Sequence, residues 1–96
     1  MSDAYTEQGY QVYDFEVDAW IATTAAEAIA AHNAAEEEEE LRTSETYAIN
    51  LDERKVWWDE HHQTRITYRE GVRRYLKAHR AGERGYSLPG FFCGEE

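Results

Sequence analysis

The fold is decided at residues 10–35, which read YQVYDFEVDAWIATTAAEAIAAHNAA. Over residues 10–22 the side chains alternate with a period of two, as they do in a strand with one dry and one wet face. One face carries Tyr13, Phe15, Val17, Ala19 and Ile21, and the other carries Asp14, Glu16 and Asp18, flanked by Val12 and Trp20. We therefore expect one half-buried strand with an acidic outer face.

An alanine-rich helix is expected to follow this strand. Thr24 and Glu27 have the spacing of a capping box, and alanine, which dominates the next residues, is the best helix former. An anionic run then falls at the helix C-terminus, where the helix dipole disfavours negative charge. The run consists of Glu36, Glu37, Glu38, Glu39 and Glu40. We expect the helix to fray within it.

Two more strands and a second helix are predicted downstream. Apolar residues alternate over residues 47–51, and residues 55–60 centre on Val56 and two tryptophans. The short connection between these segments predicts an antiparallel hairpin. Thr67 and Glu70 form a second capping box. An amphipathic helix is expected from there to Gly82, which is a typical C-terminal stop.

The tail, residues 85–96, is expected to pack back on the domain because Leu88, Phe91 and Phe92 are too apolar to stay in water. Pro89-Gly90 suits a type II turn. The predicted class is α+β: a small three-stranded, mainly antiparallel sheet with two helices on one face, in the order β-α-β-β-α. Residues 1–9 form a flexible N-terminal arm in this prediction, and residues 10–96 form one domain.

Composition limits the possible functions. The 96 residues carry 20 Asp+Glu and 10 Lys+Arg, a net charge of −10, and 42% of them are hydrophobic. The chain is too apolar for a disordered acidic tail, and its charge disfavours free nucleic acid or anionic membranes as ligands. A single cysteine, Cys93, excludes an internal disulfide and suits a reducing cytoplasm. We see no signal peptide and no apolar run of membrane-spanning length.

No catalytic or metal-binding pattern stands out in the sequence. His61-His62 lies beside Asp59 and Glu60, but adjacent strand residues point to opposite faces, so the histidine pair cannot hold one ion without a bend. A catalytic cysteine needs a base held next to it, and none is predicted for Cys93. We expect no enzyme activity, no cofactor and no metal.

The charge is divided unequally along the chain. Residues 1–60 hold 16 acidic and three basic side chains, a balance of −13, whereas residues 61–96 carry +3. The ladder of Asp14, Glu16 and Asp18 is either a solvated strand face or a recognition surface for Lys and Arg on a partner, and so is the run of residues 36–40. The basic residues of the second helix either neutralise the acidic half, within the chain or across a dimer, or contact phosphates.

Trp57 and Trp58 are neighbours, so one should face the core and the other should face outward. An exposed tryptophan ringed by charge is typical of a protein-binding hot spot. The alternative is a second apolar layer in which Phe91 and Phe92 of the tail cover these rings.

Three stretches carry a resemblance to known proteins: VDAWIATTAAEAIAAH (residues 17–32), ITYREGVRRYLKAH (66–79) and YSLPGFF (86–92). In these stretches the chain resembles small acidic proteins of phages and mobile elements, including anti-CRISPR proteins. Many of those block a nuclease complex by occupying its DNA-binding surface without catalysis. The resemblance implies the same for this chain, although it carries over no functional residue. The basic second helix departs from a uniformly acidic DNA mimic.

The hypothesis is therefore a cytoplasmic, non-enzymatic inhibitor that binds a basic, nucleic-acid-handling surface of a host defence complex. Its expected contact residues are the acidic ladder, the anionic run and one tryptophan: Asp14, Glu16, Asp18, Glu36, Glu37, Glu38, Glu39, Glu40 and Trp57 or Trp58. Two alternatives stay open. One is an accessory protein that binds another host protein or forms a homodimer, and the other is a small nucleic-acid-binding regulator.

Overall fold

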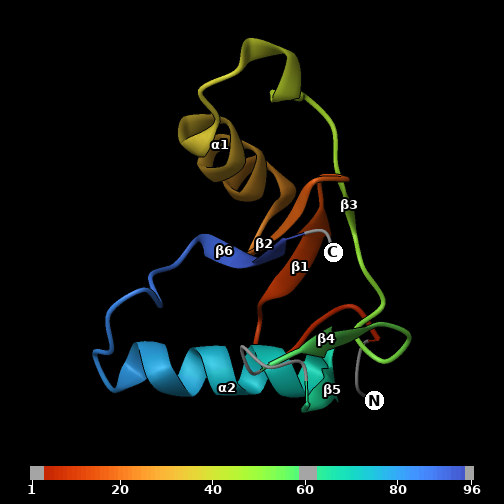
Figure 1. The fold of residues 1–96 in the computed structure, drawn as a ribbon, viewed down its shortest axis with the longest axis vertical. Coiled ribbons are helices and arrows are strands. Elements are labelled where there is room, and N and C mark those ends of the chain that lie inside the picture. Colours follow the sequence, from red (N-terminus) through yellow and green to blue (C-terminus); the bar gives the residue numbers. More distant parts are fainter. Residues whose placement is uncertain (1–3, 59–62, 95–96) are drawn as a thin grey trace.

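The computed structural model describes residues 4–58 and 63–94 as three layers, with a sheet between two helices (Figure 1). The sheet is antiparallel, with its four strands in the order β3-β1-β2-β6, and a separate antiparallel pair, β4-β5, lies beside α2. The elements are β1 (Gln11–Asp14), β2 (Asp18–Ala22), α1 (Ala25–Ala35), the 3₁₀ turn η1 (Glu39–Leu41), β3 (Tyr47–Ala48), β4 (Lys55–Trp57), β5 (Arg65–Thr67), α2 (Tyr68–Arg80) and β6 (Gly90–Gly94). The α+β class is confirmed, but the three-stranded sheet and its element order are wrong.

The single strand predicted for residues 10–22 is instead a hairpin. A strand of that length would span about 43 Å, whereas the longest dimension of the molecule is 35 Å. The chain turns at Glu16, which has a φ of 69°, and the Val17 N–H donates to the Phe15 carbonyl at 2.8 Å, as in a γ-turn. No glycine or Asn-Gly pair marks this turn, so period-two alternation continues through it unbroken.

Folding the strand back lets the sheet bury both of its faces. Val12 pairs with Ile21 and Tyr13 pairs with Trp20, and successive residues point to opposite faces. The Val12–Ile21 face packs against α2, and the Tyr13–Trp20 face packs against α1. The helices therefore cover opposite faces of the sheet, and the prediction that both lie on one face is wrong.

The hairpin predicted between residues 47–51 and 55–60 is also wrong. β3 pairs with β1, so that Tyr13 lies opposite Ala48, whereas β4 pairs with β5, so that Val56 lies opposite Ile66. The turn between the two segments is present, but Leu51 enters the core and separates the sheet from the β4-β5 pair. Local alternation identified strand-forming segments without identifying their partners.

Both helix starts are confirmed. The hydroxyl of Thr24 accepts from the Glu27 N–H, and that of Thr67 accepts from the Glu70 N–H, each at 3.2 Å. α1 ends at Ala35, just before the anionic run, and α2 ends at Arg80, two residues before Gly82. Gly82 has a φ of +76°, the left-handed conformation that ends helices.

The tail packs back on the domain as predicted. It forms β6, which pairs with β2 and places Cys93 opposite Ala19. Phe92 approaches α2 at Gly71, where an added Cβ would lie 2.7 Å from the phenylalanine ring. The predicted type II turn is wrong, because Gly90 starts β6 and lacks the positive φ that this turn requires.

Residues 4–9 of the predicted N-terminal arm contact the domain. The Ala4 carbonyl accepts from the Leu51 N–H at 2.8 Å, and Glu7 makes an ion pair with Arg69 at 3.1 Å. Within residues 4–58 and 63–94, no helix is long and apolar enough to cross a membrane.

Candidate partner-binding surface

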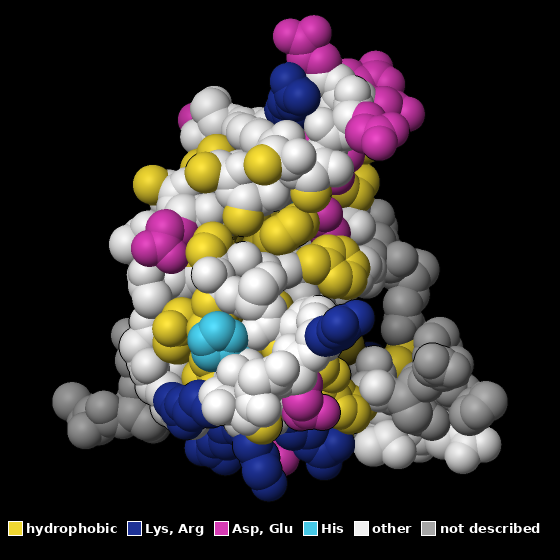
Figure 2. Space-filling model, turned by 90° about the vertical axis from the view of Figure 1, so that its left-hand side faces the viewer, with side chains coloured by type: hydrophobic (Ala, Val, Ile, Leu, Met, Phe, Trp, Pro, Cys, Tyr) yellow, Lys and Arg dark blue, Asp and Glu magenta, His cyan; other side chains and the backbone are white. Residues whose placement is uncertain are grey.

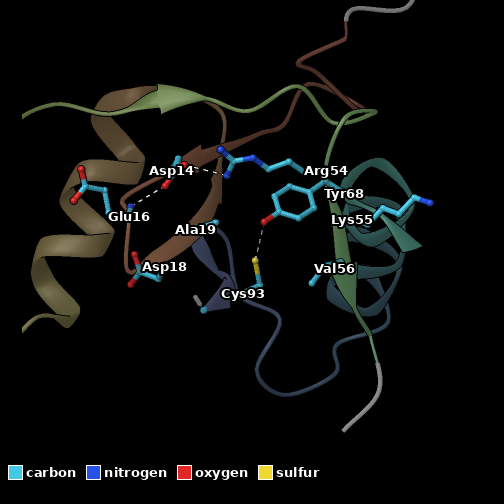
Figure 3. Close-up of a pocket in the computed structure, with 10 residues that line it drawn as sticks. Asp14, Glu16, Asp18, Ala19, Arg54, Lys55, Val56, Tyr68 and Cys93 are labelled. Carbon is cyan, nitrogen blue, oxygen red and sulfur yellow. Dashed lines mark hydrogen bonds and ion pairs between the residues drawn. The ribbon is translucent and has the colours of Figure 1, made fainter. Parts of the chain in front are cut away.

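The β1–β2 turn is organised by the carboxylate of Asp14 (Figure 3). Its Oδ1 accepts from the Glu16 N–H at 2.7 Å, and its Oδ2 accepts from the Tyr47 hydroxyl at 2.8 Å and from the Arg54 guanidinium at 3.0 Å. Burial alone would raise the pKa of Asp14, but these donors outweigh it and lower the pKa below the usual value. Asp14 therefore stays ionised and joins the turn to β3 and to the segment before β4.

The three carboxylates of the predicted ladder line one polar pocket of about 380 Å³. Asp14, Glu16 and Asp18 lie on its hairpin side, and Arg54 and Lys55 lie across from them (Figure 3). Because the hairpin turns between these residues, they surround a pocket and do not form a straight ladder. Asp14 is already satisfied within the chain, which leaves Glu16 as the exposed member of the three.

The floor of this pocket holds a pair of weak acids. The Tyr68 hydroxyl lies 3.4 Å from the Cys93 Sγ. Burial raises the pKa of Tyr68 well above its ordinary value, and the hydrogen bond with Cys93 raises it further. The phenol is therefore protonated at neutral pH and acts as a hydrogen-bonding group, not as a base.

A second groove, of about 460 Å³, begins on the other side of the hairpin turn, and we call it the acidic groove. Its exposed residues are Glu16, Val17, Glu40, Leu41, Arg42, Glu45 and Tyr47. Three of them are large apolar side chains that remain well exposed: Val17 by 38%, Leu41 by 37% and Tyr47 by 59%. Apolar anchors rimmed by charge are the composition expected of a protein-binding surface.

The glutamates of this region make no ion pair with a described residue, although one arginine, Arg42, lies among them. Across residues 4–58 and 63–94, no ion pair involves Glu16, Glu45 or residues 36–40. Arg42 also lines the groove, but its guanidinium donates to the backbone carbonyl of Glu36 at 3.3 Å. Figure 2 shows carboxylates gathered at the top of the molecule, around η1.

The five glutamates of the anionic run do not all lie in the same place. Glu40 shares the acidic groove with Glu16, and Glu38 and Glu39 continue along the same exposed loop. Glu37 is exposed just after α1. Glu36 instead turns toward Asp18 and the buried His32, which form a cluster apart from the groove.

Neither tryptophan lines the acidic groove. Both are partly buried and line a third pocket, of about 630 Å³, together with Phe91 and Phe92. The Arg65 guanidinium lies 5.5 Å from the Trp57 ring centroid, and that of Arg74 lies 5.9 Å from the Trp58 ring centroid. The expectation that one tryptophan faces the core and the other faces out is wrong, because both are partly buried and neither belongs to the core.

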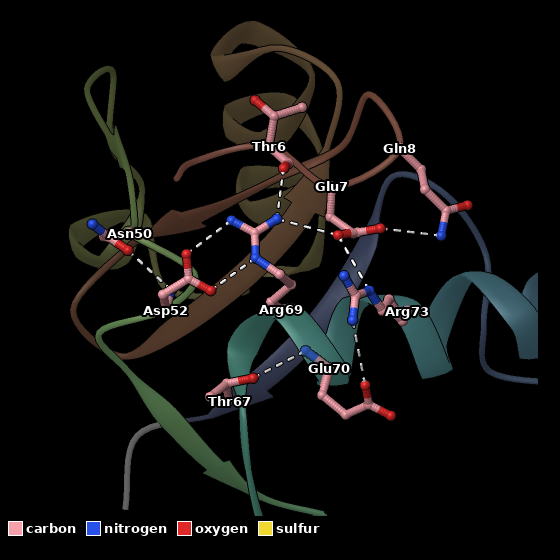
Figure 4. Close-up of polar contacts among 9 residues, drawn as sticks. All are labelled: Thr6, Glu7, Gln8, Asn50, Asp52, Thr67, Arg69, Glu70 and Arg73. Carbon is pink, nitrogen blue, oxygen red and sulfur yellow. Dashed lines mark hydrogen bonds and ion pairs between the residues drawn. The ribbon is translucent and has the colours of Figure 1, made fainter. Parts of the chain in front are cut away.

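Three arginines of α2 form ion pairs within the chain, and Figure 4 shows two of them, Arg69 and Arg73. Arg69 makes two hydrogen bonds to the Asp52 carboxylate, at 2.8 and 3.1 Å, and a third to Glu7 at 3.1 Å. Arg73 reaches Glu7 at 3.3 Å, and Arg74 reaches Glu70 at 3.3 Å. Burial alone would raise the pKa of Glu7, but Arg69 and Arg73 outweigh it and lower the pKa. Neutralisation within the chain, one of the two roles expected for this helix, is therefore present.

Several residues of this surface could not be named from the sequence. Leu41, Glu45 and Tyr47 join the groove only because β3 pairs with β1 beside the hairpin turn. Their one sequence signal is that large apolar residues stand alone in a polar, acidic stretch. His32 is the other omission, a single histidine in an alanine-rich helix. The histidine pair at residues 61–62, with Asp59 and Glu60, lies outside the described residues.

Comparison of the chain with protein-family models, with curated proteins and with solved structures finds no significant match.

Proposed function

We propose that this protein is a non-enzymatic inhibitor that binds a basic, nucleic-acid-handling surface of another protein through its acidic groove. One observation carries the proposal: exposed Val17, Leu41 and Tyr47 lie among glutamates that form no ion pair with any described residue, and the only cation lining the described groove is Arg42. A Lys- or Arg-rich segment with an apolar side chain would match this groove in both charge and shape. The resemblance to anti-CRISPR proteins suggests a host defence complex, in the host cytoplasm, as the partner.

Physical chemistry explains why such a groove would inhibit. Unpaired carboxylates steer association toward a basic surface and increase the rate of encounter. The apolar side chains then supply the affinity that charge alone does not give at physiological salt. A nucleic-acid channel occupied in this way could no longer admit the phosphate backbone of the nucleic acid. The paired arginines of α2 weigh against the regulator hypothesis, since Arg69 and Arg73 are already held by Glu7 and Asp52.

The proposal is tested by capture followed by competition. The full chain is immobilised and used to capture a partner from a bacterial lysate, and the partner, identified by mass, is purified. We expect the partner to bind nucleic acid by itself and to release it when this protein is added. A partner whose nucleic-acid binding is unaffected by saturating protein would contradict the inhibitory role.

Matched variants test the groove itself. The double variant Glu16→Gln, Glu40→Gln should weaken partner binding by about 10-fold or more and flatten its dependence on salt. The control, Glu53→Gln with Glu83→Gln, removes the same charge from exposed positions outside the groove. Leu41→Ser should weaken binding with little effect on the salt dependence. Equal losses in the groove and control variants would exclude this groove as the interface.

A further inference from the structure

His32 is buried completely beneath the hairpin turn, in the last turn of α1. Its ring stacks on Phe15, with centroids 4.2 Å apart and an interplanar angle of 9°. Its Nε2 lies 2.9 Å from the Leu41 carbonyl oxygen. Because a carbonyl can only accept, Nε2 carries a proton and donates it to Leu41. The other ring nitrogen, Nδ1, is then the atom that remains for other chemistry.

Nδ1 faces a carboxylate with which it makes no proper hydrogen bond. It lies 3.0 Å from the Asp18 Oδ1. Both atoms are shielded from solvent, and neither has a hydrogen-bond partner among the residues that the structure describes. Without a proton on Nδ1, two lone pairs would face each other at this distance and repel in a buried site. A positive charge between them, either a proton or a metal ion, would turn this repulsion into attraction.

Glu36 completes a set of three possible ligands. It is the first residue after α1, and its backbone N–H donates to the Asn33 carbonyl at 3.3 Å. One carboxylate oxygen of Glu36, one of Asp18 and a ring nitrogen of His32 all lie within 4.8 Å of one another. Ligands of a tetrahedral zinc ion at about 2.0–2.2 Å from the metal are about 3.3–3.6 Å apart. Small side-chain rotations would therefore close the set around one ion.

We propose that Asp18, His32 and Glu36 bind one divalent transition-metal ion of the zinc type, with His32 coordinating through Nδ1. One imidazole nitrogen and two carboxylate oxygens are ligands that zinc accepts, whereas calcium and magnesium prefer oxygen alone. The bond from Nε2–H to the Leu41 carbonyl is the outer-shell contact that ligating histidines usually make. The fourth position is left for water, on the side where Glu36 is partly exposed.

Such an ion would join three separate segments: the start of β2 through Asp18, the end of α1 through His32 and Glu36, and η1 through the Leu41 carbonyl. Since η1 carries Glu39, Glu40 and Leu41, the ion would also fix one wall of the acidic groove. The site does not depend on the proposed function, because its ligands and its test are independent of any partner.

The test uses the metal-free full chain titrated with Zn²⁺ in competition with a chromophoric chelator. We expect one tight site per chain. Glu36→Gln should weaken its affinity at least about 10-fold, since even outer-shell substitutions cost 10–100-fold. Glu37→Gln removes the same charge one residue away and should leave the affinity unchanged. A double variant, His61→Gln with His62→Gln, controls for the other histidine pair and should also bind normally.

A second measurement separates the ion from a proton. Nitrogen NMR of the His32 ring should show Nδ1 change on addition of one equivalent of Zn²⁺ while Nε2 keeps its proton. At a fixed zinc concentration, zinc should also raise the melting temperature of the wild type and of Glu37→Gln by the same amount, and that of Glu36→Gln by less. Equal zinc affinity in wild type and Glu36→Gln, loss of binding in the His61–His62 variant, or a His32 ring unaffected by zinc would each overturn the proposal. The cluster would then be a buried imidazolium–carboxylate pair.

Discussion

The two helical layers on either side of the sheet are built in contrasting ways. α2 buries six residues, and its arginines are bound to Glu7, Asp52 and Glu70. α1 buries only Ala28 and His32, and the loop that follows it carries glutamates without ion pairs. The α2 layer therefore uses its apolar and charged groups for stability, whereas the charges that follow α1 form no ion pairs with the described residues. Net charge alone does not distinguish these uses.

The sharpest test of this contrast compares one apolar truncation in each helix. Leu76→Ala removes a side chain with 1% exposure from the main core and should lower the free energy of unfolding by about 2–5 kcal/mol. Ile29→Ala acts on the partly buried face of α1 and should cost about 1 kcal/mol. Denaturant unfolding measures both. Similar losses in the two variants would mean that α1 is packed as firmly as α2.

The arginines of α2 give the next largest effect. Arg69→Met keeps the length of the side chain but leaves Glu7, which is only 13% exposed, without its main partner. Since hydrogen bonds to charged groups are the strong ones, we expect a loss of about 2–3 kcal/mol. Lys77→Met, on the exposed side of the same helix, should change stability by less than about 0.5 kcal/mol. If the two variants unfold alike, the α2 ion pairs do not hold the layer in place.

Asp14 connects the acidic groove to the fold, and its role depends on pH. Its pKa is lowered in the folded protein, so its stabilising effect is full above the unfolded pKa, near 3.8, and is lost as the pH falls through the folded pKa. Asp14→Asn should cost about 1–2 kcal/mol at neutral pH. The stability of this variant should also fall less than that of the wild type between neutral pH and about pH 3.

The comparison is made by thermal unfolding at a series of pH values. Glu53→Gln, at an exposed carboxylate, serves as the control and should follow the wild-type acid curve. Parallel acid curves for wild type and Asp14→Asn would show that the hydrogen bonds to Asp14 do not stabilise its ionised form. Because Glu7 also has a lowered pKa, the wild type should still lose stability in acid after Asp14 is replaced.

The helix caps test whether the two layers differ at their starts as well. Thr24→Ala and Thr67→Ala each remove one hydrogen bond to a helix N-terminus, so each should cost about 1 kcal/mol. Ser44→Ala, at an exposed site outside either helix, should have no measurable effect. Helix content and unfolding midpoints report the changes. A much larger loss for Thr67 than for Thr24 would show that the stability of the fold depends more on the start of α2 than on the start of α1.

The smallest effect on stability is expected where the charge is densest. Glu38→Gln, Glu39→Gln and Glu40→Gln together should change the free energy of unfolding by less than about 0.5 kcal/mol, since these exposed side chains make no ion pairs with the described residues. Chemical unfolding at low and high salt measures this. A substantial loss of unfolding free energy would mean that these glutamates stabilise the fold.

Several features were determined by the sequence alone because they depend on residues close together in the chain. The helix starts at Thr24 and Thr67 and the amphipathic face of α2 follow from local spacing. The end of α1 does not, because the helix was expected to fray within residues 36–40 and instead stops at Ala35. Charge segregation is equally visible in the sequence. The return of the apolar tail to the domain followed from the cost of leaving Phe92 in water.

The tertiary structure decided everything that depends on distant residues. Alternation over residues 10–22 fits a long strand and a hairpin equally well, and only burial on both faces of the sheet selects the hairpin. The same chain reversal places Glu16 and Glu40 in one groove and brings Asp18 within 3.0 Å of His32, although each pair is far apart in the sequence. Periodicity predicts which face of its own helix or strand a residue occupies. The acidic groove and the Asp18–His32–Glu36 cluster instead combine residues of several elements, so only the tertiary structure reveals them.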